Sequence, residues 1–145
     1  MKLKKILALL LTAVCLCAGF STPAYADTVS SISSPVAPAY EIPTNTWGQL
    51  IVTGTTATCT SQAVGTDIVS ITVEQTLQKY RVFGIWSKYD GTSWTSTVNS
   101  DHIYVSNTKS GLDSGKYRLK SVFKLTNSAG KTEKITTYSL EVEVG

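Results

Sequence analysis

From Trp47 to Gly145 the sequence contains no proline and runs in short stretches of alternating apolar and polar residues rich in Thr, Val, Ile and Tyr. These residue types favour strands, and alternation with a period of two places one face of a strand on a core and the other in solvent. No stretch repeats its apolar residues with the period of 3.6 that an amphipathic helix requires. The sequence therefore predicts an all-β domain over residues 47–145.

Turn-forming residues, mostly glycine, asparagine and aspartate, divide this region into expected strands. Eight short strands at this spacing predict an antiparallel β-sandwich or a barrel. The expected strands are Trp47–Val52, Thr55–Thr60, Ile68–Gln78, Arg81–Tyr89, Ser93–Val98, His102–Val105, Lys116–Thr126 and Glu133–Val144.

The first 26 residues have the parts of an export signal. Lysines at positions 2, 4 and 5 precede an apolar stretch that is expected to be helical, and Ala24 and Ala26 form the small-residue pattern that precedes cleavage. The apolar stretch has about 15 residues, fewer than the ~20 that span a bilayer. We therefore expect a cleaved signal peptide, a secreted extracellular protein and no stable membrane anchor after processing. Lipid attachment at Cys15 or Cys17 is disfavoured because large residues precede both.

Residues 27–46 are rich in Ser, Thr and Pro and are expected to form an extended or disordered leader. The chain has 13 Lys and Arg against 10 Asp and Glu, and three of the lysines lie in the signal, so charges balance after cleavage. A nucleic-acid partner is not expected, because such proteins need a clustered positive excess. Only Cys59 remains after processing, which excludes an intramolecular disulfide.

The segment from Ile103 to Leu119 contains Asp113, Gly115 and Tyr117 in the spacing Asp-x-Gly-x-Tyr. This spacing resembles the tyrosine corner of immunoglobulin-like domains, in which the tyrosine hydroxyl bonds to the backbone upstream. The resemblance implies an immunoglobulin-like sandwich of seven to eight strands, of the intermediate type, over about residues 47–144, nearly the whole domain that follows the leader. The arrangement of signal, leader and domain is also similar to that of small secreted proteins of Gram-positive bacteria.

The same resemblance assigns structural roles to further residues. Leu119 stands where the second cysteine of the family would be, and Val73 takes the place of the first, so an aliphatic pair would replace the disulfide. Trp86 would be the buried tryptophan of the central strand.

Catalytic chemistry is not indicated by the sequence. The only histidine, His102, is expected at the surface, and Cys59 is expected to be a buried apolar residue. The carboxylates show no pairing typical of glycosidases and no calcium-loop spacing. We therefore expect a non-enzymatic protein with no cofactor and no metal.

The stretch Arg81–Tyr89 has large apolar residues on both faces of an expected strand. If Trp86 points inward, then Phe83, Ile85 and Tyr89 point outward beside the basic residues of the strand Lys116–Thr126. One interpretation is that the leader or a loop covers these residues. The other is an exposed binding face. Its candidate residues are Phe83, Ile85, Tyr89, Arg118, Lys120 and Lys124.

These observations favour a secreted, non-catalytic binding module whose partner is an extracellular protein or a glycan. An alternative is a carbohydrate-directed protein, either a binding module or a small hydrolase, that stacks sugars on Trp94, Tyr89 or Tyr104. Another alternative is a structural or inhibitor-like extracellular protein.

Overall fold

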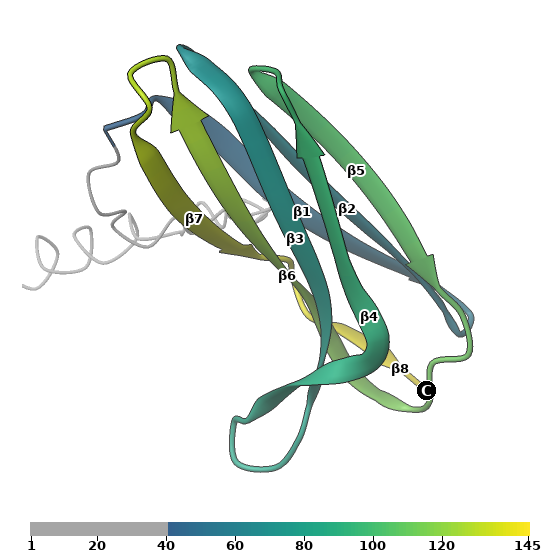
Figure 1. The fold of residues 1–145 in the computed structure, drawn as a ribbon. Coiled ribbons are helices and arrows are strands. Elements are labelled where there is room, and N and C mark those ends of the chain that lie inside the picture. Colours follow the sequence, from purple (N-terminus) through teal and green to yellow (C-terminus); the bar gives the residue numbers. More distant parts are fainter. Residues whose placement is uncertain (1–40) are drawn as a thin grey trace, which may run out of the picture. The chain divides into compact units, whose positions relative to one another are not determined.

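The computed structural model describes residues 41–145; the expected signal peptide and most of the expected leader lie outside the described residues. The described part forms two antiparallel sheets, with strand orders β1-β2-β5 and β4-β3-β6-β7, and β8 pairs with β6 (Figure 1). The expected all-β antiparallel sandwich is therefore confirmed. The strands are β1 (Thr44–Thr53), β2 (Thr56–Gly65), β3 (Ile68–Tyr80), β4 (Trp86–Val98), β5 (His102–Lys109), β6 (Gly115–Asn127), β7 (Thr132–Tyr138) and β8 (Val142–Val144).

Strand boundaries differ from the expected ones in several places, and β2 and β5 extend beyond the expected ends to Gly65 and Lys109. The expected strand Arg81–Tyr89 does not exist as such, because residues 81–85 form the β3–β4 turn and β4 then runs from Trp86 to Val98. The expected strand Glu133–Val144 is divided into β7 and β8. β1 begins at Thr44, so the expected leader ends several residues too late.

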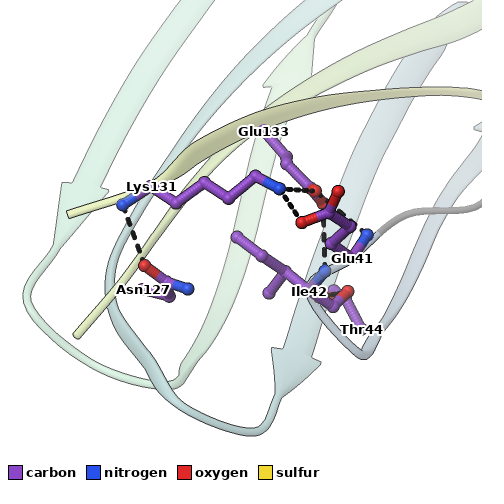
Figure 2. Close-up of polar contacts among 6 residues, drawn as sticks. All are labelled: Glu41, Ile42, Thr44, Asn127, Lys131 and Glu133. Carbon is purple, nitrogen blue, oxygen red and sulfur yellow. Dashed lines mark hydrogen bonds and ion pairs between the residues drawn. The ribbon is translucent and has the colours of Figure 1, made fainter. Parts of the chain in front are cut away.

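The residues just before β1 belong to the sandwich. Ile42 is buried in the core, and the carboxylate of Glu133 on β7 accepts hydrogen bonds from the backbone N–H groups of Glu41 (3.0 Å) and Ile42 (3.2 Å). The ammonium of Lys131 pairs with the Glu41 carboxylate, as Figure 2 shows. These contacts fix the entry of the chain into the sandwich at the end of the β6–β7 hairpin.

The core consists of two apolar clusters separated by buried polar side chains. One cluster includes Ile71, Val73 and Phe123, and the other includes Leu77, Leu119 and Cys59. The polar side chains between them form a layer that joins the sheets, and we call it the polar layer. Its members are the buried side chains of Ser61 on β2, Gln75 on β3 and Ser121 on β6, together with the partly buried Asn107 on β5.

Strand β6 has the expected faces. Tyr117, Leu119 and Phe123 are fully buried, whereas Arg118 and Lys120 are partly exposed on the opposite side. The alternation in the sequence was sufficient here because β6 lies between β3 and β7, with one face entirely on the core.

The tyrosine corner is present. The Tyr117 hydroxyl donates to the backbone carbonyl of Asp113 at 2.8 Å and lies 2.9 Å from its carboxylate. Lys79 also pairs with that carboxylate, and its aliphatic chain passes over Gly115, where an added Cβ would lie 2.6 Å from Lys79 Cε. Gly115 also has a φ of 144°, and this backbone conformation is what favours glycine, since the flexible Lys79 side chain can move away from an added Cβ.

Two structural roles implied by the immunoglobulin resemblance are wrong. Trp86 is only partly buried, at the start of β4, which is an edge strand. Val73 cannot form a cross-sheet pair with Leu119, because β3 and β6 are neighbours in one sheet and Val73 lies opposite Phe123. The residues from the other sheet that share the cluster of Leu119 are Leu50 on β1 and Ala57 and Cys59 on β2. Both roles fail for one reason: the strand that pairs with β6 is β3, whereas the strand that contains Trp86 was expected to be central and is β4, at the edge of the sheet.

Candidate binding surface

The sheet β4-β3-β6-β7 has one face on the core and one in solvent, and we call the solvent side the outer face. Strand pairing brings Trp86 opposite Tyr80, Gln78 opposite Arg118, and Lys120 opposite Tyr138. Because directly opposed residues project from the same side of a sheet, these six lie together on the outer face.

An arginine lies between two aromatic rings at the centre of this group. The guanidinium carbon of Arg118 is 4.3 Å from the ring centroid of Trp86 and 4.3 Å from that of Tyr138. Its Nε–H donates to the side-chain oxygen of Gln78 at 2.9 Å. The stacking restricts the guanidinium before any partner binds, so less side-chain entropy is lost when it does.

The outer face is predominantly basic. Among the described residues Lys116 lies 3.6 Å from Glu141, and the other lysines of this face form no ion pair. The acidic residues on this side are Glu74 on β3 and Glu143 on β8, which lies opposite Lys116. The outer-face lysines are Lys88, Lys116, Lys120, Lys124 and Lys134.

The turn between β3 and β4 exposes large apolar side chains. Phe83 is 94% exposed, Val82 66% and Ile85 58%. In Figure 1 this turn extends away from the body of the two sheets. We call residues 80–86 the β3–β4 hairpin tip.

The structure divides the predicted binding residues into three groups. Phe83 and Ile85 are exposed as expected, but in the hairpin tip rather than on a strand. Arg118, Lys120 and Lys124 lie on the outer face. Tyr89 was wrongly placed: it points inward, where its ring packs against Tyr117 with centroids 5.4 Å apart. Since Trp86 faces outward, the residue three positions later faces inward.

The aromatic residues considered for sugar stacking do not form one platform. Trp94 and Tyr89 are partly buried against the core cluster that contains Leu119. Tyr104 is exposed, but it lies on β5 in the other sheet. The sequence reasoning missed Tyr80, Trp86 and Tyr138 as surface aromatics. The dipeptide Phe83-Gly84 was the available signal, since a turn there reverses the chain and pairs Tyr80 with Trp86.

The possible catalytic groups are unsuited to nucleophilic chemistry. The Ser100 hydroxyl and the Asp101 carboxylate both contact the same ring nitrogen of His102, Nδ1, at 3.1 Å and 2.9 Å. A catalytic triad instead requires the nucleophile and the acid on different ring nitrogens. Asp101 reaches the His102 ring because it precedes β5 and lies in a bend, where neighbouring residues do not alternate between two faces.

Cys59 is fully buried, and burial raises the pKa of its thiol to about 12. The thiolate is therefore negligible near neutral pH, and nucleophilic attack requires the thiolate. Within residues 41–145, no group of three His, Cys, Asp or Glu side chains is placed to hold a metal ion. In the same range, no helix is long and apolar enough to cross a membrane.

No protein-family model and no curated protein matches the sequence. Wild-type OgpA from Akkermansia muciniphila is similar over 68% of this chain and 29% of its own, with 13% identity and a TM-score of 0.38. The CARDB domain of the PF1109 protein from Pyrococcus furiosus is similar over 69% of this chain and 88% of its own, with 13% identity and a TM-score of 0.35. This chain thus spans less than a third of the OgpA chain. Similarities of this size carry no argument about family or activity.

Proposed function

We propose that this chain is a secreted, non-catalytic binding module that uses the β3–β4 hairpin tip and the adjoining outer face. The exposure of Phe83 is the observation that carries the proposal. A phenylalanine that is 94% exposed on a sandwich with a well-formed core contributes little to folding. Val82 and Ile85 extend the same apolar surface. Contiguous exposed apolar groups with a polar margin are typical of interaction sites.

The composition of the surface supports binding rather than catalysis. Aromatic residues and arginine are enriched in interfaces, and Trp86 at the base of the tip forms one stacked group with Arg118 and Tyr138. The candidate nucleophile Cys59 is buried, and Ser100 and Asp101 meet His102 at the same ring nitrogen, which is not the arrangement of a catalytic triad.

The export part of the proposal depends on the N-terminal sequence and has its own test. Expressed with its own leader, the protein is expected in the medium with Asp27 as its first residue. N-terminal sequencing of the secreted protein checks this. Recovery of an intact Met1, or of a lipid on Cys15 or Cys17, would contradict it.

Binding is tested with the labelled mature protein, residues 27–145, added to cells and medium of the producing culture. Retained label is compared between wild type and Phe83→Ser combined with Arg118→Glu. We expect the double variant to lose most of the retention. Tyr104→Ser changes an exposed aromatic residue on the other sheet and serves as the control. We expect its retention to equal that of wild type. Equal retention by all three proteins would contradict the assignment of the surface.

A carbohydrate-directed function remains the second candidate because Trp86, Tyr80 and Tyr138 expose aromatic rings. A glycan array decides between the two, since only the carbohydrate function requires a signal there that Trp86→Ala abolishes.

A further inference from the structure

The backbone at the hairpin tip forms a tight two-residue turn. Phe83 and Gly84 have φ values of 59° and 79°, and the Ile85 N–H donates to the Val82 carbonyl at 3.3 Å. Two successive positive φ values at the centre of a hairpin are the signature of a type I′ turn. The turn is closed further by the Arg81 N–H, which donates to the Ile85 carbonyl at 2.7 Å, and by the Tyr80 hydroxyl, which accepts from Gly84 N–H at 3.0 Å.

Phenylalanine is a poor residue for the first central position of this turn. Asn, Asp and Gly are strongly preferred there, because a bulky side chain is strained at positive φ. Phe83 gains no packing in return, since its side chain is almost fully exposed. Strain at an exposed residue that does not contribute to the core points to a function of the side chain outside the isolated domain.

The side chains around the tip are arranged in a definite order along the hairpin. Val82, Phe83 and Ile85 lie at the end. Next come Tyr80 and Trp86, opposite each other, with ring centroids 5.4 Å apart. Cations lie immediately behind the two rings. Lys116 Nζ is 5.9 Å from the Tyr80 centroid, and Arg118 stacks on Trp86, while Arg81 and Lys88 add charge at the hairpin itself.

This order matches the polarity profile of a membrane interface. Apolar side chains of interfacial segments enter about 5–10 Å into the boundary between headgroups and acyl chains. The tip from Trp86 to Gly84 spans two residue steps, or about 7 Å. Tyrosine and tryptophan concentrate at the headgroup level, and basic residues are attracted to anionic lipids. A pocket in a protein partner could accept a phenyl ring, but it would not require aromatic and cationic residues at successive depths.

We propose that the β3–β4 hairpin tip inserts Phe83, Val82 and Ile85 into the interface of a bilayer that contains anionic phospholipid. The contact is peripheral and reversible, because three side chains bury too little apolar area for permanent anchoring. This inference rests on the proposed function, since the tip is part of the same surface, and it names the partner of that surface.

The test measures partitioning of the mature protein into phosphatidylcholine vesicles with and without phosphatidylglycerol. We expect binding that requires phosphatidylglycerol and weakens as salt rises. Phe83→Asn, which suits the positive φ and so preserves the turn, should weaken partitioning about ten-fold or more. Arg81→Glu should weaken it at least about five-fold.

Two control variants separate insertion of the tip from general attraction of a basic surface. Lys124 lies on the outer face about 20 Å from Arg118 along β6, and Lys124→Glu should change partitioning much less than Arg81→Glu. Tyr104→Ser, on the other sheet, should leave it unchanged. Circular dichroism confirms that each variant is folded.

Five outcomes would overturn the inference. One is absence of partitioning, and a second is equal partitioning with and without phosphatidylglycerol. A third is equal loss from Lys124→Glu and Arg81→Glu with no effect of Phe83→Asn, which would show diffuse electrostatic attraction. The fourth is concentration-dependent self-association that Phe83→Asn abolishes, without vesicle binding, which would identify a second copy as the occupant. Retention by cells or medium that depends on Phe83 but not on lipid would refute the lipid partner and leave the proposed function standing.

Discussion

The side-chain amide of Gln75 joins the two sheets by donating a hydrogen bond to the hydroxyl of Ser61 at 2.7 Å. The same nitrogen lies 3.1 Å from the carbonyl of Cys59, and Asn107 Nδ2 donates to the Gln75 oxygen at 2.6 Å. Ser61 continues the polar layer to Ser121, with 2.7 Å between the hydroxyls. A fully buried glutamine is thus satisfied on both atoms of its amide, as burial requires.

Replacing Gln75 by an apolar residue should destabilise the domain, even though burying an apolar side chain usually stabilises a core. Gln75→Leu leaves the Cys59 carbonyl and the Asn107 amide without this partner, and we expect a loss of about 2–4 kcal/mol in the free energy of unfolding. Urea denaturation measures it. The outward-facing neighbour Thr76→Ala is the control, with an expected change within about 0.5 kcal/mol. A Gln75→Leu protein as stable as wild type would show that the polar layer contributes nothing.

Thr137 on β7 lies opposite Ser121 at the edge of the same layer. Its hydroxyl is buried and has no hydrogen-bond partner among the described residues. Because valine has nearly the same shape, Thr137→Val should raise the free energy of unfolding by up to about 1 kcal/mol. Urea denaturation measures the sign of this change in stability. A clear loss of stability would mean that the Thr137 hydroxyl has a partner such as an ordered water.

Trp86 and Tyr117 should respond very differently to truncation. Tyr117 is fully buried, and Tyr117→Ala should cost about 3–5 kcal/mol or prevent folding. Trp86 is partly exposed, and its main contacts are with Tyr80 and Arg118, so Trp86→Ala should cost only about 1–2 kcal/mol. Thermal melts of the two variants measure the difference. Equally large losses of stability in the two variants would show that Trp86 is buried in the core.

The carboxylate of Asp113 makes stability depend on acid pH. Its contact with Lys79, and secondarily the hydrogen bond from Tyr117, hold the pKa of Asp113 well below its ordinary value near 3.8. Because the pKa is lower in the folded protein, the contribution to stability is complete above the unfolded-state value and is lost as pH falls below about 4. Asp113→Asn should remove this part of the acid dependence. Denaturation of both proteins from neutral to acid pH tests this prediction. The same fall of the free energy of unfolding with pH in both proteins would contradict it.

The turn residue Phe83 should be replaceable with a gain in stability. The left-handed conformation costs an ordinary residue roughly 1–2 kcal/mol, and asparagine tolerates it better. Phe83→Asn should therefore raise the free energy of unfolding by about 1 kcal/mol, with Phe83→Ala as the control that keeps most of the strain. A lower melting temperature for Phe83→Asn would show that the phenyl ring has packing that its exposure does not reveal.

The sequence alone determined those features that depend on neighbouring residues. Alternation along β6 placed Tyr117, Leu119 and Phe123 on the core, because a period of two assigns the faces of a strand buried on one side. The spacing of Asp113, Gly115 and Tyr117 predicted the tyrosine corner, because its hydrogen bond joins residues only four apart.

The tertiary structure alone decided which residues meet across strands. In Arg81–Tyr89 both faces are apolar, so alternation could not choose the inward one, and the turn at Phe83-Gly84 settled it by pairing Trp86 with Tyr80. Val73 and Leu119 lie in one sheet because β3 pairs with β6. The polar layer joins residues far apart in the chain, such as Ser61 and Ser121. Strand pairing is non-local, and a shift of one residue reverses every face, so local pattern could not specify the outer face on which the proposed binding depends.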